Sequence, residues 1–209
     1  SSLLRAKVSP SGLPRGHVPR SGLIDACRGD GTDRLVSVTA PAGYGKTTLL
    51  AEWASCDERS VGWVSLDEGD NDPVSLIASL AAAFGSTQGL PARFWESMSG
   101  PGGAVLGRLG PRLASAMASA ERPFVLMVDD LHEVTSLDSH DVIDLLVGSI
   151  PDGSTFVISG RTEAPGLAGW RLRTPTHEGG PDHLAFDSEE AAQFFRLGGS
   201  SVPTEAVGL

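Results

Sequence analysis

The sequence is poor in cysteine and tyrosine, with two and one in 209 residues, and it has no long apolar run. Cys27 and Cys56 have neither the spacing of metal ligands nor the number that a disulfide framework needs, so a reducing, cytoplasmic location is expected. No stretch approaches the roughly 20 apolar residues of a membrane-spanning helix, and the first residues lack the apolar segment of a secretory signal. We therefore expect no membrane partner.

Basic residues are scarce as well. The chain has 16 Lys and Arg against 26 Asp and Glu, a formal net charge of −10. Binding to nucleic acid requires clustered Lys and Arg against phosphates, so this acidity argues against a DNA-reading surface within the chain. The length and the 40% hydrophobic content suit one domain with a sizeable core, together with a fragment of a second.

Apolar runs alternate with helical patterns along the chain. The expected strands are Leu35–Thr39, Val61–Leu66, Phe124–Val128, Thr155–Ser159 and, more weakly, His183–Phe186. The expected helices are Ser21–Arg28, Thr47–Cys56, Val74–Phe84, Ala104–Ala120, Leu137–Ile150 and Asp187–Leu197. The first four strands are apolar almost throughout, which is typical of a parallel sheet covered on both faces. The alternation predicts a doubly wound α/β fold, and the glycine-rich segment 97–103 is expected to be a surface loop.

The strongest motif is Ala40-Pro41-Ala42-Gly43-Tyr44-Gly45-Lys46-Thr47-Thr48, which lies between an apolar strand and a helix. This is the context of a P-loop, in which glycines let backbone N–H groups approach phosphates at a helix N-terminus. Lys46 is then expected to reach the β- and γ-phosphates and Thr47 to bind Mg²⁺. Ala40 replaces the usual first glycine, a variant that a negative φ permits. A glycine-rich turn without ligand is the alternative, but it leaves the lysine unexplained.

Two carboxylates, Asp129 and Asp130, end the apolar strand that starts at Phe124. The carboxyl ends of parallel strands meet at the edge where open α/β sheets bind ligands. Asp129 is expected in the Mg²⁺ shell, because this ion prefers oxygen donors. Asp130 is expected to orient or deprotonate an attacking water. Helix capping by the pair is the alternative.

Two weaker signals come from the same sheet edge. Arg161 follows the strand that ends at Ser159, and from there a guanidinium can reach a γ-phosphate; a surface ion pair is the alternative. The acidic loop 67–72 follows the second strand. Asp67 is placed either to support a metal or water shell or to lie in a solvated turn before Asp72, the expected N-cap of the next helix.

In their order along the chain, these motifs resemble the nucleotide-binding domain of the large ATP-binding LuxR-type (MalT-like) transcriptional regulators. These regulators belong to the STAND class of P-loop ATPases (NB-ARC/NACHT-like). The resemblance also covers Lys7, the segment His17-Val18-Pro19-Arg20, the loop 65–71, Asp129-Asp130-Leu131-His132 and residues 184–191. It implies a three-layer P-loop NTPase fold of the STAND/AAA+ type with a five-stranded parallel sheet in the order 5-1-4-3-2.

The resemblance also implies roles for individual residues. Val18 and Arg20 match a motif that lies against the adenine, and Arg161 matches the residue that senses the γ-phosphate. The implied catalytic residues are Asp130, Lys46 and Arg161, and Thr47 and Asp129 are the implied metal ligands. The remaining nucleotide-binding residues are Ala42, Gly43, Tyr44, Gly45 and Thr48 of the P-loop.

The expected organisation has three parts: an arm over residues 1–20 that contacts the nucleotide, a P-loop domain over 21–186, and the first part of a helical lid over 187–209. By resemblance, winged-helix, repeat and DNA-binding domains follow beyond this chain, so contact with DNA is expected only through them. The expected function is a switch that binds ATP or ADP with Mg²⁺, hydrolyses ATP slowly, and self-associates in the ATP state. A scaffold that binds nucleotide without catalysis and a small-molecule kinase remain as alternatives.

Overall fold

The computed structural model describes residues 7–10, 12–98 and 102–197, with the backbone alone at 102–106. Its centre is a five-stranded sheet in the order β2-β3-β4-β1-β5, in which every pair of neighbours is parallel. The strands are β1 (Leu35–Thr39), β2 (Ser60–Ser65), β3 (Phe124–Asp129), β4 (Thr155–Gly160) and β5 (Thr176–Gly179). Read from the other edge, this is the expected order 5-1-4-3-2, and the expected three-layer fold is confirmed.

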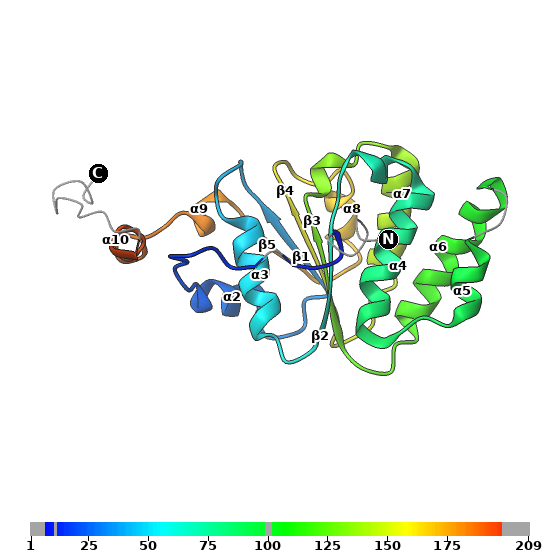
Figure 1. Cartoon of the computed structure of the whole chain (residues 1–209), viewed down its shortest axis with the longest axis horizontal. Helices are drawn as coiled ribbons and strands as arrows, with labels where there is room; N and C mark the ends of the chain where they lie inside the picture. The colour runs from blue at the N-terminus through cyan, green and yellow to red at the C-terminus, as the bar shows by residue number, and fades with distance from the viewer. Residues whose placement is uncertain (1–6, 11, 99–101, 198–209) are drawn as a thin grey trace.

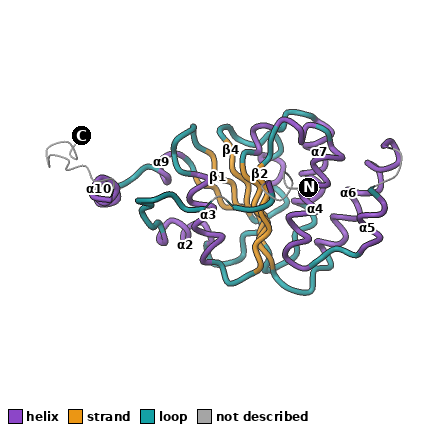
Figure 2. Tube along the Cα trace, viewed as in Figure 1, coloured by secondary structure: helices purple, strands orange, loops and turns teal. Residues whose placement is uncertain are grey.

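Helices cover both faces of the sheet (Figure 1). One layer contains α2 (Ser21–Arg28) and α3 (Lys46–Cys56); the other contains α4 (Pro73–Gln88), α5 (Ala92–Ser97), α6 (Gly102–Ala118) and α7 (Leu137–Val147). Figure 2 shows the strands enclosed between the two layers. The core is accordingly divided into two apolar clusters, one on each face of the sheet. Because both faces are covered, β3 and β4 are buried along their whole length.

The helix starts follow from local sequence. Asp72 caps α4 by accepting a hydrogen bond from the Ser75 backbone N–H at 3.0 Å, and Pro73 occupies the first helical turn, where it leaves no N–H unsatisfied. Short helices complete the described chain: η1 (Glu68–Asn71), η2 (Leu131–Glu133), α8 (Leu167–Trp170), α9 (Pro181–Leu184) and α10 (Ser188–Leu197). None of the helices in the described part of the chain is long and apolar enough to cross a membrane.

The prediction of a fifth strand over His183–Phe186 is wrong. Strand β5 is Thr176–Gly179, which pairs with β1 from Leu35 to Val38, and His183 and Leu184 end helix α9. Leu184 packs from that helix into the smaller core cluster, which explains why this segment contains a buried apolar residue. β5 lies at an edge of the sheet and is only half-buried, so its sequence has no apolar run. Part of the predicted loop 97–103 lies outside the described residues, and α6 begins at Gly102 within it.

The end of α3 makes a pH-dependent contribution to stability. Burial alone raises the pKa of Asp57, but hydrogen bonds from Arg59 and Trp53 outweigh it and hold that pKa at about 2. A depressed carboxyl pKa stabilises the fold above the unfolded pKa near 4 and loses that effect as the pH falls through 2. We expect Asp57→Asn to lower the free energy of unfolding by about 2 kcal/mol at pH 7. Urea titrations at pH 7 and pH 2 test this, and an undiminished difference at pH 2 contradicts it.

Candidate nucleotide site

The segments that follow β1, β4 and β3 meet at one edge of the sheet, because these strands are parallel neighbours in that order. The glycine loop follows β1, the turn at Arg161 follows β4, and the two aspartates lie at the end of β3. The structure therefore brings together the three strongest motifs of the sequence. Ligands of open α/β sheets bind at this carboxyl edge.

The glycine loop connects β1 to α3 and positions Lys46 at the first turn of that helix. Gly43 and Gly45 have φ of +87° and +79°, the left-handed region in which a side chain is strained. The Nζ of Lys46 donates to the carbonyl oxygens of Ala40 at 2.7 Å and Pro41 at 3.0 Å, and the residue is 7% exposed. Burial lowers the pKa of Lys46, opposed by the nearby Asp130 and Asp129 carboxylates. The ammonium is thus held within the loop.

A hydrogen-bonded chain joins the P-loop to the ends of β3 and β4. The Thr47 hydroxyl donates to Oδ2 of Asp129 at 2.7 Å, and the Ser159 hydroxyl donates to Oδ1 of the same carboxylate. Asp129 is 1% exposed. Thr47 and Asp129, the two expected metal ligands, are therefore in direct contact. Their oxygens are of the kind that Mg²⁺ prefers, so the donor set fits this ion.

Asp130 has an unusual backbone for a residue with a side chain. Its φ of +60° is the only positive value at a residue other than glycine in the described part of the chain, and its N–H donates to Ser159 Oγ at 3.3 Å. This left-handed turn separates the carboxyl groups of the consecutive aspartates, since Asp129 is buried and the side chain of Asp130 is 40% exposed. Burial and the Asp129 charge raise the pKa of Asp130, while His132, Lys46 and Arg161 act in the opposite direction. A carboxylate with a raised pKa is a better proton acceptor than an ordinary one.

Arg161 leaves the sheet one residue after the end of β4, because Gly160 still pairs with Thr39 of β1. Its charge lowers the pKa of both Lys46 and Asp130, so it lies within electrostatic reach of each. The alternative of a surface ion pair finds no support here, because Arg161 forms none with the residues that the structure describes. The guanidinium is exposed.

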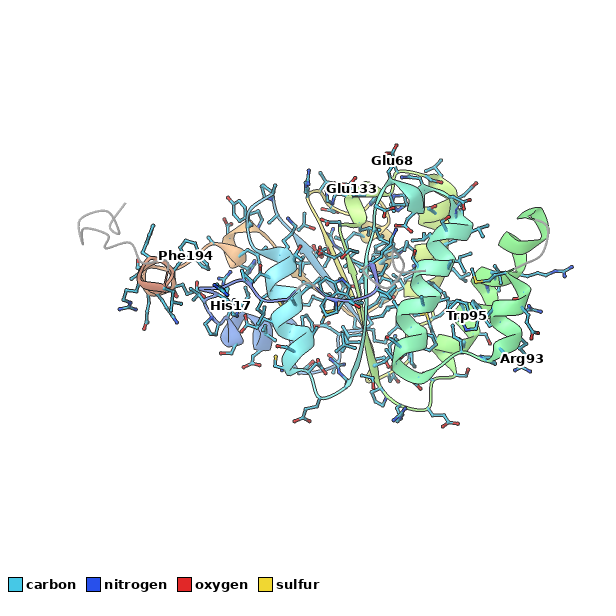
Figure 3. The ribbon with its side chains drawn as sticks, viewed as in Figure 1. His17, Glu68, Arg93, Trp95, Glu133 and Phe194 are labelled. Atoms are coloured by element: carbon cyan, nitrogen blue, oxygen red, sulfur yellow. The ribbon has the colours of Figure 1, made fainter. Side chains whose placement is uncertain are left out.

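A cavity of about 620 Å³ adjoins the glycine loop. Its walls are the arm around Val18, the loop residues Gly43–Gly45 with Thr48, and α10 with Phe194. Figure 3 shows His17 of the arm and Phe194 of α10 at the same end of the molecule. The lining is mostly apolar, with Tyr44 at its border, 40% exposed. A cavity of this size and lining, next to a phosphate-type loop, suits a planar aromatic base.

Arg20 lines this cavity, but its side chain is engaged elsewhere. It pairs with Glu190 of α10 and donates to carbonyl oxygens of residues 183–185. The Arg20 backbone N–H donates to both carboxylate oxygens of Glu52, at 2.9 and 3.1 Å. Val18 is 4% exposed and packs beside the loop. The arm therefore lines the cavity, with its arginine turned toward α10.

The acidic loop after β2 is structural. Asp67 caps η1 by accepting from the Gly69 backbone N–H, and it pairs with Lys7 at 2.9 Å. Lys7 also pairs at 2.5 Å with Asp70, which is fully buried. These carboxylates are occupied by a lysine and by backbone groups, which favours the capping interpretation over a metal or water shell.

Ser159 and Glu52 contribute to the site but were not singled out from the sequence, and Glu190 lies within the segment 184–191 that the resemblance covers, without a role in the site assigned to it. The sheet order could have indicated Ser159, because β4 lies between β1 and β3 and its last residues must face both. No local signal indicates Glu52 or Glu190. Their partners lie 32 and 170 residues away in the chain.

A parallel sheet in this order, with a glycine loop and lysine after β1 and paired aspartates at the end of β3, defines the chain as a P-loop NTPase domain. Over 97% of its length, it is 35% identical to the HTH-type transcriptional regulator MalT of Yersinia enterocolitica. It is 37% and 36% identical over 92% of its length to the MalT regulators of Cronobacter sakazakii and Klebsiella pneumoniae. The chain spans 22% of the length of each relative. The resemblance to MalT-like regulators is thereby confirmed.

Family models and solved structures were compared with the chain as well. No family model matches the chain. A solved structure of Drosophila ORC bound to DNA matches 98% of this chain and 53% of the ORC chain, with a TM-score of 0.49 and 17% sequence identity. Domain III of the Thermotoga maritima replication initiation protein DnaA is matched with a TM-score of 0.45 and 12% identity, over 96% of this chain and 80% of its own.

Proposed function

We propose that this chain is the ATP-binding and slowly hydrolysing switch module of a signal-responsive LuxR-type transcriptional regulator. The observation that carries the proposal is the direct contact of Thr47 with Asp129 beside a loop-held Lys46, next to a cavity that suits a base. In the whole protein, the ATP or ADP state would control self-association, and DNA would be bound by a part outside this chain. Residues 1–20 would act as a nucleotide-contacting arm, 21–186 as the P-loop domain and 187–209 as the start of a lid.

The binding step follows from the loop. Ala42, Gly43, Tyr44 and Gly45 would present backbone N–H groups to the phosphates, and α3 adds the positive end of its dipole. Lys46 would exchange its bonds to loop carbonyls for bonds to the β- and γ-phosphates, with Thr48 beside the α-phosphate. The base would enter the cavity against Val18. Thr47 and Asp129 would hold Mg²⁺, which supplies charge neutralisation of the phosphates.

Hydrolysis would use the exposed carboxylate. Asp130 accepts the proton of a water whose oxygen attacks the γ-phosphorus, and the bond from that phosphorus to the bridging oxygen of ADP breaks. Lys46 and Arg161 stabilise the negative charge on the transferred group. Arg161 would also distinguish ATP from ADP, because only ATP offers it a γ-phosphate. A ligand shifts a conformational equilibrium only by its differential affinity for the two states.

Calorimetric titration of the nucleotide-free chain with ATP and with ADP, each with Mg²⁺, tests the proposal. We expect saturable binding of both with a stoichiometry of one, followed by slow release of phosphate from ATP. Binding without any turnover would favour the scaffold alternative. A folded chain that binds neither nucleotide contradicts the proposal for this chain.

A further inference from the structure

Helix α10 is held to the rest of the molecule in an unusual way. None of its residues is buried, yet it forms one wall of the cavity that the P-loop borders. Figure 1 shows it at the end of the molecule, beyond the α2–α3 layer. A helix without buried apolar residues gains little stability from packing, so its position depends on a few specific contacts.

The principal contact is a single arginine from the arm. The Nε of Arg20 donates to Oε1 of Glu190 at 2.9 Å and one Nη donates to Oε2 at 3.1 Å, a bidentate pair. The other Nη donates to the Leu184 carbonyl oxygen at 2.7 Å, and the guanidinium lies 5.2 Å from the centre of the Phe186 ring. With side chains 10% and 22% exposed, Arg20 and Glu190 are largely shielded from water. Charge-assisted bidentate pairs of this kind are among the strong polar contacts of proteins.

The same arginine is fixed from its other side by the P-loop helix. Its backbone N–H donates to both carboxylate oxygens of Glu52 on α3, and His17 lies 3.2 Å from the same carboxylate. Gly16 of the arm lies close to Leu197 at the end of α10. Arg20 thus links helix α3 to helix α10 through direct contacts, and these contacts lie around the cavity.

We infer that Arg20 is a positioning residue that couples occupancy of the cavity to the position of α10. We call the pair of Arg20 and Glu190 the Arg20 clamp. A base in the cavity would contact both the arm and α10, so its binding favours the state in which Arg20 and Glu190 are paired. By linkage, formation of that pair raises the affinity for the base by the same factor. The inference rests on the proposed function for the identity of the ligand. It assigns to Arg20 a contact with α10 in place of a contact with the nucleotide.

The test uses three variants: Arg20→Gln, Glu190→Gln and the double variant that carries both changes. The control is Glu189→Gln, which neutralises a neighbouring exposed carboxylate without a side-chain partner among the described residues. In the nucleotide-free chain, we expect amide hydrogen exchange in 188–197 to become about 10- to 100-fold faster in either clamp variant. Exchange in β1 and β3 is expected to stay unchanged, and Glu189→Gln is expected to behave as the wild type. Unchanged exchange of α10 in both clamp variants overturns the inference.

Affinity for ADP and ATP provides the second readout. If Arg20 acts through α10, Glu190→Gln alone weakens binding about as much as Arg20→Gln, and Arg20→Gln weakens it no further when residue 190 is already Gln. If Arg20 instead contacts the nucleotide, Arg20→Gln weakens binding by the same factor whether residue 190 is Glu or Gln, and the clamp is overturned. A wild-type chain that binds no nucleotide refutes the proposed function, while the exchange of the nucleotide-free chain still decides the clamp. Glu190 Oε2 also accepts the Asp187 backbone N–H at 3.0 Å, so Glu190→Gln alone does not separate the clamp from the helix cap. Should Arg20→Gln fail to fold, Arg20→Lys, which keeps the charge but not the bidentate pair, replaces it in the exchange test.

Discussion

Replacing Lys46 by alanine is expected to weaken binding of Mg²⁺-ATP by about 100-fold while leaving the fold intact. The Nζ is held by two loop carbonyls and can transfer its hydrogen bonds to phosphate oxygens at the same place. A charge-assisted hydrogen bond contributes roughly 1.5–3 kcal/mol, so a net gain of one such bond, after the bonds to the loop carbonyls are given up, accounts for an effect of this size. Calorimetric titration of the variant beside the wild type measures it.

The matched control for Lys46→Ala is Arg93→Ala, which also removes one positive charge. Arg93 is exposed on α5, at the end of the molecule opposite His17 and the cavity (Figure 3). Its removal is expected to leave the affinity unchanged within about twofold, because exposed charges at such a distance are largely screened by salt. Equal losses in the two variants would mean that the effect comes from net charge, and the assignment of Lys46 to the phosphates would fail.

Asp130→Asn is expected to slow ATP hydrolysis by about 10²- to 10⁴-fold with little effect on ATP binding. The range is that of a lost general base. Asparagine is the suitable replacement because it tolerates the left-handed backbone that this position adopts, whereas alanine would add strain. In the wild type, hydrolysis should increase with pH through the raised pKa of Asp130, since only the carboxylate accepts a proton. Phosphate release under single-turnover conditions at several pH values gives both results.

Glu133→Gln is the control for Asp130→Asn, because it removes a neighbouring exposed carboxylate that also lies near His132, 3.2 Å from its ring. We expect this variant to hydrolyse ATP at nearly the wild-type rate. An Asp130→Asn variant with full activity would exclude Asp130 as the base, and a variant that no longer binds ATP would assign the residue to binding.

The central strands and the P-loop could be predicted from the sequence, whereas β5 and the clamp could not. β1, β3 and β4 are buried on both faces, so their apolar runs are a direct consequence of their position. β5 is a half-buried edge strand of four residues, and its place is fixed by pairing with β1. The pattern therefore favoured the apolar segment at Leu184, which belongs to a helix.

In the candidate site, too, some contacts could be predicted from the sequence and others could not. Contacts within the P-loop follow from local glycine and lysine chemistry, and the contact of Thr47 with Asp129 follows once the sheet order is known. The role of Arg20 depends on Glu190, 170 residues away, on a helix whose own sequence says only that it is amphipathic. The resemblance implied that Arg20 lies against the adenine, but it could not indicate that the side chain turns toward α10.

The position of Tyr44 makes the chain a convenient subject for fluorine NMR. It is the only tyrosine of the sequence, and it borders the cavity within the glycine loop. Biosynthetic incorporation of 3-fluorotyrosine would therefore place one fluorine resonance at the entrance to the site, with no second signal to assign. None of the four tryptophans lines that cavity, and Trp53, Trp63 and Trp170 are buried in the core, so indole fluorescence remains a separate measure of unfolding. One sample could thus report ligand exchange and global unfolding through independent spectroscopic channels.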